Sequence, residues 1–173
     1  MHIAVASDHA GVSLKQTVLA FLRGLGHTVE DLGTYDTKPV DYPDSAQAVA
    51  DAILSQRVKR AVLICGSGVG ASVAANKFPG IRAGLCHDTY SAHQGVEHDH
   101  MNVLVLGGRV IAEMLAHELV GAFVGAKQSQ EERHLRRLAK IEVIEGECGG
   151  LFKVVPGARR LRNSRRRLVK KER

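Results

Sequence analysis

The sequence of 173 residues contains no tryptophan, and aromatic residues make up only 4% of it. So few aromatic rings disfavour a nucleic-acid surface built on base stacking. The sequence also lacks any run of roughly 18 apolar residues, the length that a membrane-spanning helix needs. Residues 1–6 have neither the basic start nor the long apolar stretch of a secretory signal. We therefore expect a cytoplasmic protein with no membrane segment.

Cysteine is scarce as well. The three cysteines are Cys65, Cys86 and Cys148, an odd number with no CxxC spacing. This pattern argues against both a disulfide framework and a thiolate zinc site. A functional cysteine in this chain would act through its reactivity.

The positive charge is unevenly distributed. The formal net charge is +6, but residues 151–173 alone hold ten Lys or Arg and a single acidic residue, Glu172. Residues 1–150 then hold 14 basic and 17 acidic side chains and are mildly acidic. We predict one domain over residues 1–148 and a basic, disordered tail over 149–173. Weak nucleic-acid contact by this tail is conceivable, but an inert extension is the favoured interpretation.

Short apolar runs alternate with stretches of helical periodicity along the domain. Such alternation predicts an α/β fold, a Rossmann-like three-layer sandwich with a five-stranded parallel sheet. The expected strands are 2–6, 27–32, 60–65, 81–86 and 102–106, and the expected helices are 11–25, 44–56, 71–76, 89–95, 110–124 and 130–144. Sheets of this type bind ligands at the carboxyl ends of their strands, so the residues after each strand are the candidates for function.

The strongest local signal is the segment 65–71, Cys-Gly-Ser-Gly-Val-Gly-Ala, after the third expected strand. It has four possible interpretations. The first is an ordinary tight turn in which Cys65 is a core residue. The second is a phosphatase loop, which is disfavoured because Ala71 stands where the phosphate-binding arginine belongs. A dinucleotide fingerprint is another, with Asp88 about twenty residues on. The fourth is a base with an oxyanion cradle, in which Cys65 takes a proton and loop N–H groups stabilise the developing charge.

Other polar groups fall near predicted strand ends. Asp8 and His9 follow the first strand, although such a pair is more often a helix cap. His98 and His100 alternate in what we expect to be an extended loop, and no third ligand completes a metal site. On the last helix, two arginines four residues apart share one face and suit a phosphate, unless they only pair with neighbouring glutamates.

Taken together, these residues resemble the type B ribose-5-phosphate isomerases and the galactose-6-phosphate isomerase subunits. The matching segments are 6–11, 41–43, 65–70, 74–77 and 98–102, together with Arg133, His134 and Arg137. They occur in the family's order over residues 1 to about 145. Ser67 stands where many members have threonine, and the tail has no counterpart.

The resemblance implies a homodimer, or a tetramer of two such dimers, whose active sites use both subunits, with no metal and no organic cofactor. It implies that Cys65 is the base, with Ser67 beside it, and that His98 opens the sugar ring. Asp8 is also among the catalytic residues that the resemblance implies. The implied substrate-binding residues are Asp8, His9, Tyr42, Gly66, Ser67, Gly68, Gly70 and Asn102, and the implied phosphate ligands are His9, Arg109, Arg133 and Arg137. Asn102 and Arg109 are expected to reach in from the neighbouring chain.

The implied reaction is the interconversion of ribose 5-phosphate and ribulose 5-phosphate, a step of the pentose phosphate pathway, through an enediolate. The alternatives are galactose 6-phosphate or allose 6-phosphate as substrate, or a sugar-phosphate-binding module that has lost turnover. The residues themselves are consistent with this chemistry, because proton abstraction beside a carbonyl needs a base, an oxyanion cradle and a handle for the substrate.

Overall fold

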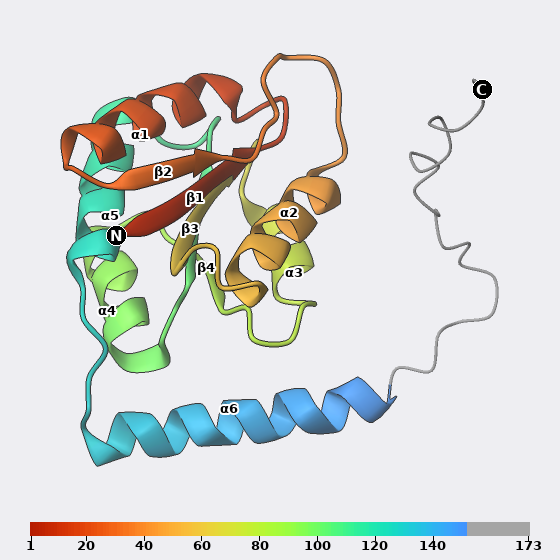
Figure 1. The fold of residues 1–173 in the computed structure, drawn as a ribbon, viewed down its shortest axis with the longest axis vertical. Helices are drawn as coiled ribbons and strands as arrows, with labels where there is room; N and C mark the ends of the chain where they lie inside the picture. The colour runs from red at the N-terminus through yellow and green to blue at the C-terminus, as the bar shows by residue number, and fades with distance from the viewer. Residues whose placement is uncertain (152–173) are drawn as a thin grey trace, which may run out of the picture.

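In the computed structural model, which describes residues 1–151, five parallel strands form one sheet between two layers of helices (Figure 1). The expected three-layer α/β sandwich is confirmed. The elements are β1 His2–Ser7, α1 Val12–Gly24, β2 Thr28–Asp31, α2 Tyr42–Leu54, β3 Arg60–Cys65, α3 Val69–Ala75, β4 Ala83–Leu85, α4 Thr89–Asp99, β5 Val103–Gly107, α5 Glu113–Gly125 and α6 Glu132–Leu151. The strand order is β2-β1-β3-β5-β4.

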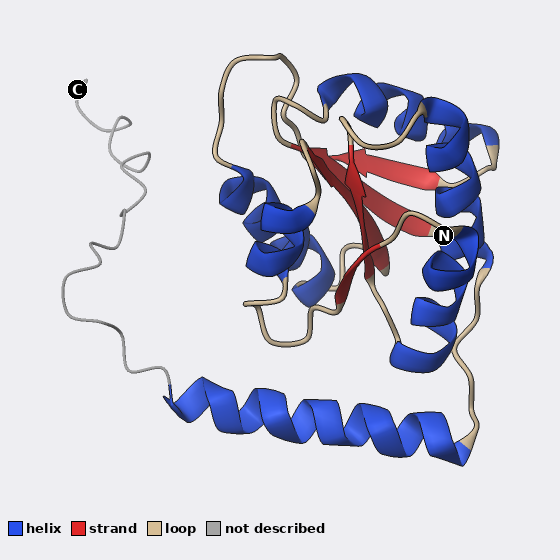
Figure 2. Cartoon of the chain, turned by 180° about the vertical axis from the view of Figure 1, so that it is seen from behind, coloured by secondary structure: helices blue, strands red, loops and turns tan. Residues whose placement is uncertain are grey.

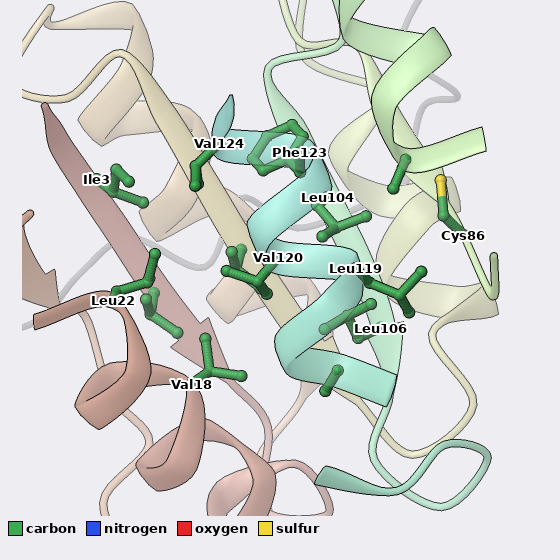
Figure 3. Packing of buried hydrophobic residues seen from close by; sticks show 14 of the residues in the cluster. Ile3, Val18, Leu22, Cys86, Leu104, Leu106, Leu119, Val120, Phe123 and Val124 are labelled. Atoms are coloured by element: carbon green, nitrogen blue, oxygen red, sulfur yellow. The ribbon is translucent and has the colours of Figure 1, made fainter. Parts of the chain in front are cut away.

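The middle residues of the central strands are apolar because both faces of these strands are covered. In β3, Val62 and Ile64 face a core formed with α1, α4 and α5, whereas Leu63 faces a second core formed with α2 and α3. Figure 2 shows these two helical layers on either side of the sheet. Figure 3 shows the first core, in which Val120 and Phe123 of α5 lie beside the sheet.

Several element boundaries differ from the expected ones. α2 begins at Tyr42 rather than Asp44, because Pro43 occupies the first turn and Asp41 is the N-cap. α4 continues to Asp99, four residues beyond the expected end. β4 is only three residues long, and it lies at the edge of the sheet.

The last helix, α6, lies along the side of the sandwich opposite the 33–41 segment (Figure 1). It extends to Leu151, seven residues beyond the expected end at 144. The start of the predicted tail, 149–151, is therefore helical, and the rest of that tail lies outside the described residues. No helix in the described part of the chain is long and apolar enough to cross a membrane.

Candidate active site

Three neighbouring strands bring several of the predicted residues to one edge of the sheet. β1, β3 and β5 are adjacent, and they lead into Asp8, Gly66 and Arg109 at their carboxyl ends. Backbone hydrogen bonds join the loops, since Asp8 N donates to the Ile64 carbonyl at 3.1 Å and Arg109 N donates to the Gly66 carbonyl at 3.0 Å. The edge is therefore one connected surface.

Cys65 is the last residue of β3, and its side chain faces the loop that follows. It is only 5% exposed. The amide of Gly68 donates to its Sγ atom at 3.1 Å. A backbone N–H therefore points at the sulfur from within the loop.

This loop requires glycine at position 68. Gly68 has a φ of +84°, and a Cβ atom there would lie 2.5 Å from Leu85 Cδ1. The residue therefore combines a left-handed backbone with a close approach to the sheet. Ser67 beside it is exposed, and its Oγ accepts a hydrogen bond from Val69 N at 3.3 Å.

Asp8 is buried and organises the turn into α1. Its Oδ1 accepts from Ala10 N at 2.8 Å and from Gly11 N at 3.1 Å. Part of its function is thus the structural one that we considered for this pair. Its neighbour His9 is half-buried, and the amide of Val40 donates to its Nδ1 at 3.2 Å. Because Nδ1 accepts, the proton of the neutral ring is on Nε2.

Tyr42 forms part of the rim of the same edge. A Cβ atom on Gly70 would lie 2.8 Å from Tyr42 Cζ, so the phenol ring packs directly against that glycine. The ring remains 42% exposed. Tyr42, Gly66, Gly68 and Gly70 therefore lie together around Cys65.

Arg109 also belongs to this edge in its own chain. A Cβ atom on Gly66 would lie 3.9 Å from Arg109 Nε. The guanidinium-bearing side chain thus runs past the glycine loop, and it is exposed. We expected Arg109 to reach the site of a neighbouring chain; in the structure it comes two residues after the end of β5, which is hydrogen-bonded to β3, and it lies beside the glycine loop of its own chain.

Asn102 lies away from Cys65 of its own chain. Asn102 precedes β5, so it lies at the amino edge of the sheet. Its Oδ1 accepts from Arg82 N at 2.8 Å and its Nδ2 donates to the Gly80 carbonyl at 2.8 Å. With both halves of the amide bound to backbone, the residue fixes the loop before β4.

His98 lies in the last turn of α4, not in the extended loop that we expected. The residues before it continue the helix, which ends at His100 in a left-handed conformation. Since α4 begins after the carboxyl end of β4 and returns past the sheet, His98 lies near the amino edge, away from Cys65 of the same chain. Gln94 Nε2 lies 2.8 Å from His98 Nδ1, and the ring centroid of His134 is 3.9 Å from that of His98.

The two arginines of α6 are exposed on that same side of the molecule. Arg133 Nε pairs with Glu131 Oε2 at 2.7 Å, the contact that a solvated helix would make. Between the arginines lies His134, which is buried against α4. Burial and the neighbouring His98 lower the pKa of His134 below its usual value. The structure therefore brings His98 and α6 together, at the opposite edge from Cys65.

A cavity of about 310 Å³ lies elsewhere, between β4, α4 and α6. Its lining includes Arg82, Cys86, Asp99 and Met101, and no predicted site residue. Burial and the nearby Asp88 raise the pKa of Cys86 to about 11, so this cysteine is a thiol at neutral pH. Within residues 1–151, no cluster of three metal-ligating side chains occurs.

The sequence analysis overlooked Lys15. This lysine is fully buried on α1, and its Nζ lies 2.6 Å from Asp31 Oδ1. The available signal was its position, because Lys15, Val18, Leu19 and Leu22 share one helical face that is otherwise apolar.

Comparisons with known proteins identify the family of this chain. The model of the Ribose/Galactose Isomerase family matches residues 3–141. Ribose-5-phosphate isomerase B of Escherichia coli is 44% identical over 143 residues, which cover 83% of this chain and 95% of that protein. The galactose-6-phosphate isomerase subunit LacB of Clostridium acetobutylicum is 35% identical over 86% of this chain and 87% of its own length.

Solved structures give the same result for the fold. The ribose-5-phosphate isomerase B of Clostridium thermocellum superposes with a TM-score of 0.83 at 42% identity, covering 86% of this chain and 99% of that one. Sequence and structure thus match over the whole domain that carries the site. The chain belongs to the ribose/galactose isomerase family, whose members are sugar-phosphate isomerases.

Proposed function

We propose that this protein interconverts ribose 5-phosphate and ribulose 5-phosphate through an enediolate, with Cys65 as the base. The observation that carries the proposal is the contact of Gly68 N with Cys65 Sγ at 3.1 Å, at the edge that also holds Arg109. A thiolate held by an amide can remove the proton from C2 and return it to C1. Backbone N–H groups of the 66–70 loop then stabilise the negative oxygen.

The phosphate handle comes from side chains around this edge. His9 offers Nε2–H, and Arg109 offers a guanidinium beside Gly66. Asp8 has its Oδ1 occupied by backbone amides, so Oδ2 is the oxygen that binds a sugar hydroxyl. Ser67 presents an exposed hydroxyl next to the base. Remote binding of the phosphate holds the reacting carbons in register with the sulfur.

The ring-opening residue must come from a second copy of the chain. His98 and the two arginines of α6 lie at the opposite edge from Cys65. In a two-fold symmetric dimer, the His98 edge of one protomer can face the Cys65 edge of its partner. We infer a homodimer with two such shared sites, in which Arg133 and Arg137 complete the phosphate site of the partner.

A matched pair of variants tests the base. In an assay of ribulose formation from ribose 5-phosphate, Cys65→Ala lowers kcat by orders of magnitude. Cys86→Ala is the control, because it removes an equally buried thiol that lies away from the site. Full turnover by Cys65→Ala would remove this cysteine from the mechanism.

Mixing two defective variants tests the shared site. Cys65→Ala and His98→Asn, each inactive alone on the ring form, are unfolded together and refolded. Random pairing leaves about a quarter of the sites with both groups intact, so activity returns to about a quarter of the wild-type value. If both residues act within one chain, the mixture stays inactive.

Galactose 6-phosphate is the second candidate substrate, because a galactose-6-phosphate isomerase subunit matches 86% of this chain. The same base and cradle serve a six-carbon sugar, and only the depth of the site differs. The ratio of kcat/KM for the two sugar phosphates decides between them. Exclusive turnover of the hexose phosphate would overturn the pentose assignment.

A further inference from the structure

We propose that the buried Lys15 and its partly exposed partner Asp31 are a positioning pair that holds His9 in place through the 33–41 segment. The inference rests on the proposed function in one respect, the assignment of His9 to the substrate phosphate. Neither Lys15 nor Asp31 reaches the site itself. They act at the start of the segment whose far end contacts His9.

The burial of Lys15 is unusual for its residue type. Its side chain is 0% exposed, and it takes a position on the apolar face of α1 where leucine or valine would pack. A buried ion pair is rarely the most stabilising choice, since an apolar pair of similar size often does as well. The charge of Lys15 therefore points to a task other than filling the core.

Asp31 links this charge to the turn after β2. Its Oδ1 binds Lys15 Nζ at 2.6 Å and also accepts from Gly33 N at 3.0 Å. Its backbone carbonyl accepts from the Tyr35 hydroxyl at 3.1 Å, and Lys15 Nζ lies 4.7 Å from the centre of the Tyr35 ring. One ammonium group thus contacts both the carboxylate that holds Gly33 and the aromatic ring that begins the segment.

The segment has few other attachments. Residues 35–41 are all exposed. In the described part of the chain, hydrogen bonds attach residues 34–41 to other parts of the protein at four places. Thr34 donates to the Ser7 carbonyl, the Tyr35 hydroxyl donates to Asp31, Val40 donates to His9, and the Asp41 carbonyl accepts from Asp44 N. The position of Val40 therefore depends on how the segment begins at Asp31 and how it ends at Tyr42.

The Val40 contact determines what His9 can do. Its amide donates to His9 Nδ1 at 3.2 Å, which places the proton of the neutral imidazole on Nε2 and restricts rotation of the ring. A displaced Val40 would leave the ring free to rotate and to exchange tautomers. Loss of the pair thus weakens phosphate binding without touching the base.

The first test reads the ring directly. Long-range ¹H–¹⁵N spectra of the full chain, with His9 assigned by a His9→Asn variant, should show the Nε2–H tautomer in the wild type. In Lys15→Met, the two nitrogen shifts should move toward the average of both tautomers. Where Lys15→Met folds poorly, Lys15→Met combined with Asp31→Asn removes the unpaired charge. An unchanged His9 spectrum in the folded variant would overturn the proposal.

The second test is kinetic. If Lys15 acts through His9, Lys15→Met raises KM for ribose 5-phosphate about fivefold to tenfold, while kcat stays within about twofold. In a His9→Ala background the same substitution adds little, because the group it positions is gone. Equal KM effects in both backgrounds would contradict the proposal.

Two further variants separate positioning from stability. Val40→Pro removes the N–H donor to His9 and fixes φ at this exposed position, and it should reproduce the rise in KM with little change in the free energy of unfolding. Arg57→Met is the matched control, since it breaks the ion pair with Glu30 on the same strand, β2, and should leave KM unchanged. Val40→Pro with wild-type KM would refute the link through Val40.

The spectra also distinguish this proposal from the proposed function. If the wild type shows no isomerase activity but His9 changes tautomer in Lys15→Met, the reaction is wrongly assigned and the positioning pair stands. If the wild type is active but the His9 spectrum is the same in Lys15→Met, the reaction is correctly assigned and the positioning pair is refuted.

Discussion

Replacing Gly68 with alanine tests the loop on which the proposed chemistry depends. The backbone φ of +84° costs an L-residue roughly 1–2 kcal/mol. The new Cβ would also meet Leu85 Cδ1 at 2.5 Å and the Leu106 backbone at 3.2 Å, and such overpacking adds about 1–3 kcal/mol. We therefore expect the free energy of unfolding to fall by about 2–5 kcal/mol, from a typical total of about 5–15 kcal/mol.

The same substitution should impair catalysis beyond the loss of stability. Relief of the clash moves the Gly68 amide away from Cys65 Sγ, which it now contacts at 3.1 Å. A hydrogen bond to a charged group contributes about 1.5–3 kcal/mol, so kcat should fall about tenfold to a hundredfold. The loss should be measured at a temperature where the variant is fully folded.

Gly24→Ala is the matched control for this experiment. Gly24 ends α1, and a Cβ atom there would have nothing within 4 Å. Alanine at a compatible helical position stabilises by about 0.4–1 kcal/mol, and kcat should not change. Urea unfolding followed by circular dichroism gives both free energies. The reasoning is refuted if Gly68→Ala is as stable as the wild type and retains its kcat within about twofold.

Three shorter predictions follow from other residues. Arg109→Met should raise KM about tenfold, because it removes a cation from the proposed phosphate site. Arg136→Met, which changes an exposed residue of α6, is the control and should leave KM unchanged. Equal KM values for Arg109→Met and the wild type would remove Arg109 from the phosphate site. Because burial and His98 lower the folded-state pKa of His134, the unfolded chain takes up the proton first as the pH falls below about 6.5. Unfolding free energy should thus decrease from pH 7.5 to 5.5, and His134→Gln should flatten that dependence; an unchanged slope would contradict it. Truncation after Leu151 should leave kcat and KM within about twofold, and a larger loss would show that the basic tail contributes to the site.

The sequence was most informative where local pattern and burial coincide. The continuous apolar run of β3 predicted a central parallel strand, and the glycines after it predicted the loop that contacts Cys65. Residues directly after strands, such as Asp8 and Arg109, could be placed at one edge because parallel strands end together. Family resemblance then added roles that spacing alone does not supply.

The errors arose where a tertiary contact decides the outcome. For Asn102 we predicted a ligand-binding amide, and only the fold shows that both halves of this amide bind backbone groups some twenty residues earlier in the chain. We predicted a loop for the Glu-His-Asp run at 97–99 because it lacks a helical apolar face. In the structure, Val96 before it packs in the core, and α4 continues through these residues. Lys15 was missed because sequence shows a lysine, whereas only the fold brings Asp31 within 2.6 Å of it.

The separation of Cys65 and His98 onto opposite edges has a consequence for gene duplication. In the shared-site dimer that we propose, a duplicate copy that lost its sulfur would still furnish an imidazole to an intact sister, and the reverse would hold too. Each such mixed pair retains a single working centre. Two diverging paralogues of this chain would thus retain activity even after each has lost a different catalytic group, provided that they continue to assemble together.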